Sequence, residues 1–410
     1  MSTDTPSPVN RKIGFVEFLV LAAALMACQA LAIDAMLPAL PTIAAAFNVD
    51  NENHAQWVVT AYVAGMGCGQ LFWGVLSDRF GRRPVLLTGL SLYVLAALLA
   101  GYSNSFTGLL GWRYVHGLAA ACVVVSRSVI RDLYSGRQMA RVMSLTFIVF
   151  IMVPIMAPTI GQGILQLAPW RYLFVLFSVY GATVWTWVLL RLPETLHPEY
   201  RLTLTVTHVA QSARRVVNDR ASVFYTLSVA VIFGSMIGYI GMVQQIFAGV
   251  FHRPGLMPTM FAVCAGSMGV TSFINSRIVE RIGMRKVSQT GLLLFITLSS
   301  THALIAALGM ETLTTFVMLQ AATMSCMGLM VANFGTMAME SMASVAGIAA
   351  SFQGFVSTTG GALVGALIGR QFNNSTVPLA TGAALCGLLA LSFVMIAERG
   401  RLFRPHHSAG

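Results

Sequence analysis

Apolar stretches of about 20 residues, the length that spans the hydrocarbon core of a bilayer as a helix, recur along the whole chain. Inside lipid, only helices and closed barrels satisfy every backbone hydrogen bond. Charged residues make up 10% of the 410 residues, against about a quarter in soluble domains. The sequence therefore predicts an all-α integral membrane protein with twelve spans: 15–37, 56–76, 85–102, 106–126, 142–165, 171–190, 223–248, 258–279, 287–309, 313–338, 347–369 and 378–397.

The basic residues are distributed unevenly between the two sides of this topology. Of the 25 Lys and Arg residues, 21 fall in loops and tails on one side, three fall on the other, and Arg113 lies within a span. Cytoplasmic loops carry such an excess of positive charge. We therefore expect both termini to be cytoplasmic, and we interpret the net charge of +11 as a sign of orientation rather than of a nucleic-acid partner.

A short motif occurs twice, at an offset of 202 residues. The loop after the second span reads Asp78-Arg79-Phe80-Gly81-Arg82-Arg83, and the loop after the eighth reads Glu280-Arg281-Ile282-Gly283-Met284-Arg285. Six spans separate the copies, so both halves enter the membrane in the same orientation, as in transporters built from parallel repeats. The predicted organisation is a tail (1–14), a six-helix bundle (15–190), a central loop (191–222), a second six-helix bundle (223–397) and a second tail (398–410).

The first copy extends backwards, and three further motifs lie within spans. They are Gly74-x-Leu76-x-Asp78-Arg79-x-Gly81-Arg82-Arg83, Asp34-x-x-x-Pro38, Leu109-x-x-x-Arg113-x-x-x-Gly117 and Pro154-x-x-Ala157-Pro158-x-x-Gly161. With these motifs the chain resembles the major facilitator superfamily, and within it the twelve-helix drug:proton antiporters of the Bcr/CflA (bicyclomycin and chloramphenicol resistance) type. The resemblance covers about 15–398 and implies two parallel six-helix bundles and proton-coupled drug export. The chain departs from the family pattern at Ala157, where Gly is usual, and at His116, where Gln is usual.

A proton-coupled transporter needs a titratable group inside the membrane, and few are available. Of the 14 acidic residues, only Asp34 lies within the outer part of a span, because the others fall in tails, loops or span ends. Arg113 is the one Arg well inside a helix, where an unpaired charge costs several kcal/mol, and it matches the functional Arg of the family's fourth helix. We predict that Asp34 and Arg113 form the proton-coupling site, and that they approach one another or share a cavity.

Two simpler interpretations stay open for this site. Asp34 can be a solvated residue at the end of its helix, and Arg113 can be a structural donor to backbone carbonyls. His116 lies one turn beyond Arg113 on nearly the same face, where it can relay protons or simply satisfy a hydrogen bond. His302 has no predicted role.

The loop motif predicts a conformational gate on the cytoplasmic side. Gly81 allows a tight turn, and the Arg cluster can reach neighbouring carboxylates. A positive-inside anchor with a helix cap is the alternative interpretation. The predicted gate comprises Asp78, Arg79, Gly81, Arg82 and Arg83, together with Pro154, Pro158 and Gly161 in the fifth span.

Polar and aromatic residues in spans that line a central cavity are the candidates for substrate contact. With few intramembrane carboxylates, the chain favours small amphipathic compounds that are neutral or weakly charged. The predicted substrate-binding residues are Tyr62, Met66, Tyr239, Gln244, Gln245, Asn333, Phe352 and Gln353.

We therefore predict a proton-driven multidrug exporter of the bacterial inner membrane. Its partners are small-molecule substrates, protons and the lipid bilayer, and it is expected to work as a monomer. It uses the proton gradient as its energy source, without a cofactor or metal. Proton-coupled uptake of a metabolite on the same fold is the alternative. An enzyme is disfavoured, because the sequence has no phosphate-binding loop, metal-ligand cluster or Ser/His/Asp set inside the membrane.

Overall fold

The computed structural model describes residues 13–49, 52–134, 136–197, 199, 206–342 and 345–403. In this part of the chain, eleven helices are long and apolar enough to cross a membrane. The helix α7 adds a twelfth, with an apolar portion at Met152–Leu167. The prediction of a twelve-helix, all-α membrane fold is confirmed.

The helices fall into two sets of six spans. The first half contains α1 (Phe15–Asp34), η1 (Leu37–Ala39), α2 (Leu40–Ala46), η2 (Glu52–Gln56), α3 (Trp57–Phe80), α4 (Arg82–Gly101), α5 (Phe106–Ala120), η3 (Ala121–Val124), α6 (Val125–Leu133), α7 (Gly136–Leu167) and α8 (Arg171–Arg191). The second half contains α9 (Val206–Asn218), α10 (Arg220–Gln245), η5 (Ile246–Val250), η6 (Pro254–Leu256), α11 (Met257–Ile282), α12 (Met284–Ala307), α13 (Leu313–Met339), α14 (Ala346–Gly369) and α15 (Val377–Ala397).

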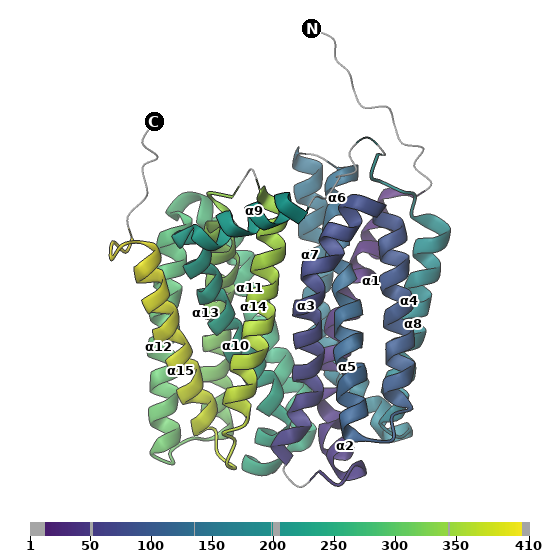
Figure 1. Cartoon of the computed structure of the whole chain (residues 1–410). Helices are drawn as coiled ribbons and strands as arrows, with labels where there is room; N and C mark the ends of the chain where they lie inside the picture. The colour runs from purple at the N-terminus through teal and green to yellow at the C-terminus, as the bar shows by residue number, and fades with distance from the viewer. Residues whose placement is uncertain are drawn as a thin grey trace.

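The two halves stand side by side, with their long helices running from one end of the molecule to the other (Figure 1). They meet where α3 packs against α14 and where α7 packs against α11. The helix α1 begins and α15 ends at the same end of the bundle, and α9 lies across that end (Figure 1). The charge distribution predicts this end to be cytoplasmic, and we call the opposite end the outer end.

Glycines allow the closest helix contacts. A Cβ on Gly65 of α3 would clash with the carbonyl of Tyr114 in α5, and a Cβ on Gly117 of α5 would clash with the carbonyl of Tyr62 in α3. In the second half, a Cβ on Gly365 of α14 would meet Ile237 of α10. Small residues let helix backbones approach closely where the surrounding lipid offers no hydrophobic drive for association. Close approach of helices at glycines therefore contributes to the packing of each half.

The helices extend beyond several of the predicted spans. The first predicted span ends at residue 37, whereas α1 ends at Asp34 and the chain continues through η1 and α2 to Ala46. Pro38 and Pro41 lie in the first turns of these segments, since proline lacks an N–H and is tolerated in a first turn. The fourth predicted span ends at residue 126, but η3 and α6 extend it to Leu133. Hydropathy detects only the part of a helix that lies in hydrocarbon, so polar ends are missed.

The predicted central loop after α8 contains the helix α9. Val216 on α9 is buried and packs with Met342 and Ala349 of the second half. The apolar face of α9 therefore packs against α14 and the end of α13.

Candidate functional site

Arg113 joins three helices in the core of the first half. Its side chain is fully buried. Its Nε donates to the carbonyl of Val58 in α3 at 3.1 Å, and its Nη2 donates to the carbonyl of Ala32 in α1 at 3.0 Å. The guanidinium also lies 4.4 Å from the centre of the Tyr62 ring. In the described part of the chain no carboxylate pairs with Arg113, so backbone carbonyls and an aromatic face stabilise its positive charge.

Asp34 is the last residue of α1, and only 4% of it is exposed. None of the described residues forms a hydrogen bond or ion pair with its carboxyl group. Arg113 reaches the carbonyl of Ala32, two residues earlier in the same helix, but does not pair with Asp34. The structure therefore brings the two predicted residues to the same turn of α1 without joining them.

Gly161 of α7 packs against this turn. A Cβ on Gly161 would clash with the carbonyl of Ala35, the residue after Asp34. Pro154 and Pro158 lie within α7, in the two turns before Gly161. Proline removes backbone hydrogen bonds from a helix interior, so α7 stays helical next to Asp34 but lacks two backbone N–H donors there.

His116 lies next to Arg113 in a cage of aromatic rings. Its Nδ1 is 3.2 Å from Nη1 of Arg113. A guanidinium can only donate, so Nδ1 accepts and Nε2 carries the proton of a neutral imidazole. Nε2 is buried without a partner, and the ring centre lies 4.2 Å from that of Tyr93 and 5.2 Å from that of Tyr62.

Three tyrosines reach the backbone of α1 alongside Arg113. The hydroxyl of Tyr180 donates to the carbonyl of Ala24 at 2.9 Å, and that of Tyr93 donates to the carbonyl of Cys28 at 3.1 Å. The hydroxyl of Tyr62 lies 3.5 Å from the carbonyl of Gln29. The sequence marks Tyr93 and Tyr180 only as hydroxyl-bearing aromatics in apolar spans, and the prediction missed both.

The predicted substrate-binding residues do not gather in one place. Tyr62 and Met66 are buried in α3 near Arg113, and Tyr239 stacks on Phe261 with ring centres 5.8 Å apart. Asn333 donates to Asn275 at 2.9 Å, and Gln353 donates to the carbonyl of Gly335 at 3.1 Å. Phe352 packs with the cluster around Val216 at the predicted cytoplasmic end.

Gln244 and Gln245 lie at the outer end, where side-chain amides bridge the two halves. The Nε2 of Gln56 donates to Gln245 at 2.6 Å, and the Nε2 of Gln245 donates to Asn53 at 3.1 Å. Gln56 also lies 3.3 Å from the carbonyl of Gly369. A cavity of about 370 Å³ beside this bridge is lined by Leu40, Pro41, Ala44, Ala45, Asn48, Val49, Ala55, Gln56, Gly241, Gln244 and Gln245. We call the contacts of Asn53, Gln56 and Gln245 the outer amide bridge.

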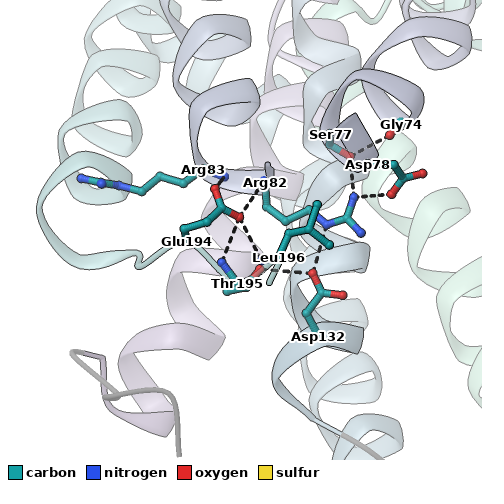
Figure 2. A network of polar contacts seen from close by, with 9 residues as sticks. All are labelled: Gly74, Ser77, Asp78, Arg82, Arg83, Asp132, Glu194, Thr195 and Leu196. Atoms are coloured by element: carbon teal, nitrogen blue, oxygen red, sulfur yellow. Dashed lines mark hydrogen bonds and ion pairs between the residues drawn. The ribbon is translucent and has the colours of Figure 1, made fainter. Parts of the chain in front are cut away.

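At the predicted cytoplasmic end of the first half, Arg82 joins two carboxylates. Its Nη1 lies 2.5 Å from Asp78, and its Nε lies 3.0 Å from Asp132 (Figure 2). Nη1 also donates to the hydroxyl of Ser77 at 2.8 Å. Arg79, another member of the predicted gate, is exposed and stacks on Phe80. The motif thus separates into a paired Arg82 and an Arg79 without an ion pair among the described residues.

Glu194, in the stretch after α8, caps the first turn of α4. Its two carboxylate oxygens accept from the backbone N–H groups of Arg82 at 2.9 Å and Arg83 at 3.2 Å (Figure 2). Gly81 precedes this turn with φ of +104°, and a Cβ there would meet the Glu194 carboxylate. A carboxylate is favoured at a helix N-terminus, so Glu194 both caps α4 and fixes the central stretch to the first half.

The second half has its own network at the same end. Arg285 lies 2.8 Å from Glu398 and 3.0 Å from Glu340, and the hydroxyl of Tyr225 also donates to Glu398. Glu398 is 2% exposed, although its place at a span end suggests solvation. Neighbouring helix ends cover it, which the sequence order does not reveal.

Comparisons with known proteins agree with this architecture. The sequence profile of the Major Facilitator Superfamily matches residues 22–366. A bicyclomycin resistance protein homolog of Haemophilus influenzae is 28% identical, over 90% of this chain and 92% of its own. The multidrug resistance protein MdtL of Escherichia coli is 28% identical, over 92% and 95%.

Solved structures share the fold at low sequence identity. A D-xylose–proton symporter matches with a TM-score of 0.70 at 13% identity, covering 94% of this chain and 99% of that one. The human organic anion transporter MFSD10 matches with a TM-score of 0.67 at 17% identity, covering 92% and 98%.

Proposed function

The chain belongs to the Major Facilitator Superfamily, a family of membrane transporters, and on that premise we propose that it exports small amphipathic compounds, neutral or weakly charged, in exchange for protons. The observation that carries this proposal is Asp34. It is a buried carboxyl group in α1 with no partner among the described residues, two residues from the carbonyl that Arg113 binds. A carboxyl group in a dry environment favours its neutral form, and a nearby cation favours its charged form.

Alternating access changes the surroundings of Asp34. A proton enters from the outer side and neutralises the carboxyl group as substrate leaves. A small shift of α1 along α5 would then exchange the Ala32 carbonyl for the Asp34 carboxylate as the partner of Arg113. That exchange favours release of the proton on the cytoplasmic side. The backbone hydrogen bonds that Pro154 and Pro158 cannot donate within α7, and the close packing of Gly161 on Ala35, support a helix pair that can move at this point.

His116 takes part by positioning Arg113. Its Nδ1 accepts one N–H of the guanidinium, while the aromatic cage holds the ring. The relay role remains a proposal that its unpartnered Nε2 supports.

Export of drugs is supported by the two relatives, whose names describe resistance to bicyclomycin and to several drugs. We propose that Tyr62, Met66, Tyr239, Gln244, Gln245, Asn333, Phe352 and Gln353 contact substrate at successive stages of the cycle. The lack of charged side chains among them fits neutral compounds. We also propose that the contacts of Arg82 form a cytoplasmic latch that opens in each cycle.

The cellular setting is part of the same proposal. A multi-pass protein with this charge distribution would lie in a bacterial inner membrane with both termini in the cytoplasm. We propose that a monomer, with one central pathway between its halves, is the working unit. The proton gradient supplies the energy, and no cofactor takes part.

The test uses everted vesicles that carry an acid-inside pH gradient. Adding chloramphenicol or bicyclomycin should release part of the gradient, and Asp34→Asn should abolish that release while sparing downhill exchange. Glu280→Gln, which changes an exposed acid in the last turn of α11, is the matched control and should behave as the wild type. Intact gradient-driven transport by Asp34→Asn would refute the proton site.

Uptake of a metabolite is the competing function. A metabolite importer would not dissipate the pH gradient of the vesicles with any drug of a broad panel. In intact cells, its substrate would instead drive proton entry. A susceptibility screen of an overexpressing strain separates the two, because an exporter raises the tolerated concentration of its substrates.

A further inference from the structure

Another buried acid lies in the half of the molecule that does not contain Asp34, at its outer end. His302, near the end of α12, lies with its Nε2 2.6 Å from Oε1 of Glu311, in the loop before α13. Their side chains are 2% and 7% exposed. The hydroxyl of Thr376, at the start of α15, donates to the other carboxylate oxygen. We call His302, Glu311 and Thr376 the outer triad.

Because the outer triad is buried, its net charge affects the stability of the surrounding packing. Removing a carboxylate from water costs several kcal/mol unless a partner compensates. A proton on the imidazole creates a charge-assisted hydrogen bond and a net charge of zero. Histidine is the side chain that exchanges its proton near neutral pH. When the proton leaves for external water, the same pocket keeps a net charge of −1, and the packing around it weakens.

Few other groups can compensate that charge. The helix α13 contributes Phe316 and α15 contributes Thr376, and neither changes charge near neutral pH. The other charged or titratable side chains of this end of the second half are His252, Arg253 and Arg370. All three are exposed, and none forms a contact with His302 or Glu311 among the described interactions.

Aromatic contacts connect the outer triad to the interface between the halves. The ring centre of His302 lies 5.5 Å from that of Phe316, which lies 6.1 Å from that of Phe247. Phe247 belongs to η5, a π-helical turn that directly follows Gln245. Such turns are frequent at functional sites, and Gln245 is the second-half member of the outer amide bridge.

We propose that His302 and Glu311 form a second proton-binding site, which takes its proton from the outer medium, and that the bound proton keeps the outer ends of the two halves together through Phe316 and Phe247. Exposed Leu308 and Met310 place the intervening loop next to solvent, so the proton has a short route. In an exporter, protons arriving outside would then favour closure of the outer end. The site does not depend on which compound the protein carries.

Hydrogen exchange tests this proposal without any substrate. The full chain in lipid nanodiscs is compared at the two ends of the range of about pH 5 to 8 in which histidine titrates, after correction for the intrinsic effect of pH on exchange. We expect backbone protection of residues 246–256 to fall by about fivefold or more at the alkaline end, the lower limit of typical coupling between sites. His302→Gln should abolish the pH response, whereas His252→Gln, which changes an exposed histidine at the same end, should keep it.

Two further variants separate the site from its connection. Glu311→Gln is nearly isosteric and should also abolish the response, so it carries the test if His302→Gln does not fold. Phe316→Leu should keep the pH response of residues 308–312 and lose that of residues 246–256. A wild-type response in both His302→Gln and Glu311→Gln would overturn the proton site, and a wild-type response in Phe316→Leu would overturn the connection.

Asp34→Asn completes the design. The outer triad is separate from Asp34, so this variant should keep the wild-type pH response of residues 246–256. Loss of that response would show a single proton site and overturn the proposal. A failure of the drug-export hypothesis would appear in the vesicle assay and leave this measurement unchanged.

Discussion

The two halves carry acids at corresponding positions of their predicted cytoplasmic ends but connect them to different arginines. Asp132 and Glu340 lie at the ends of the corresponding helices, and Glu194 and Glu398 follow the last helix of each half. In the first half, Arg82 pairs with Asp132 while Glu194 caps a helix. In the second half, position 284 is Met, and the next residue, Arg285, pairs with both acids.

The difference shows that the two halves place acids at the same positions of the fold but pair them with different partners. The first half uses two acids for two tasks, one for a side chain and one for the backbone of α4. The second half uses both acids on a single guanidinium, and Glu280, the counterpart of Asp78, is exposed without an ion pair among the described residues. We therefore expect the first-half loop to be the more firmly fixed of the two.

The largest loss of stability is expected when Arg82 is replaced by Met, the residue at the corresponding position 284 of the second half. Arg82→Met leaves Asp78 and Asp132 without their cation, and breaking such a partly buried network costs about 3 kcal/mol. Thermal unfolding in detergent should show this loss, together with reduced transport. Arg79→Met, which changes an exposed neighbour, is the matched control. Equal stability of both variants would contradict the importance of Arg82.

Glu398→Gln should have the next largest effect, about 2 kcal/mol, because Arg285 and Tyr225 lose a charged hydrogen-bond partner. Arg285 keeps Glu340, so the loss should be smaller than that of Arg82→Met. The same unfolding measurement compares the two, and the reverse order would mean that the second-half loop is the firmer one.

The two motif glycines offer a smaller and more specific comparison. Gly81 and Gly283 have φ of +104° and +91°, so alanine at either should cost about 1 to 2 kcal/mol. Only at Gly81 would the Cβ meet Glu194, so Gly81→Ala should cost about 1 kcal/mol more through the lost cap. In a Glu194→Ala background that excess should vanish, as a double-mutant cycle can measure. A persisting excess would show that Glu194 is not its cause.

The smallest effect is expected for the two motif acids. Asp78→Asn weakens the ion pair with Arg82 and should lower the melting temperature slightly, whereas Glu280→Gln should leave it unchanged. A clear loss in Glu280→Gln would reveal a partner of Glu280 outside the described residues.

The sequence predicts the fold well, because membrane spans and charge asymmetry depend on composition over long windows. It predicts the ends of helices less well. Residues 127–133 are polar enough to look like a loop, yet they belong to α6 and place Asp132 beside Arg82.

The candidate site is less predictable, because the order of residues does not show which side chains of different helices come into contact. The spacing of Asp34 and Arg113 indicates their depth in the membrane but not that Arg113 binds the Ala32 carbonyl. Elimination of acids by loop position also overlooked Glu311, which is buried against His302. Whether a loop residue is solvated depends on neighbouring helix ends, and only the assembled fold supplies those. The roles of the site residues stay predictions.

The hydrogen bonds that Tyr180, Tyr93 and Arg113 donate to α1 all end on main-chain carbonyls. Substitutions in the side chains of α1 leave such acceptors in place. The side chains of α1 can therefore change during evolution without loss of these hydrogen bonds. A related chain can acquire new drug preferences through such point mutations, while the carboxyl group at the end of the helix keeps its position.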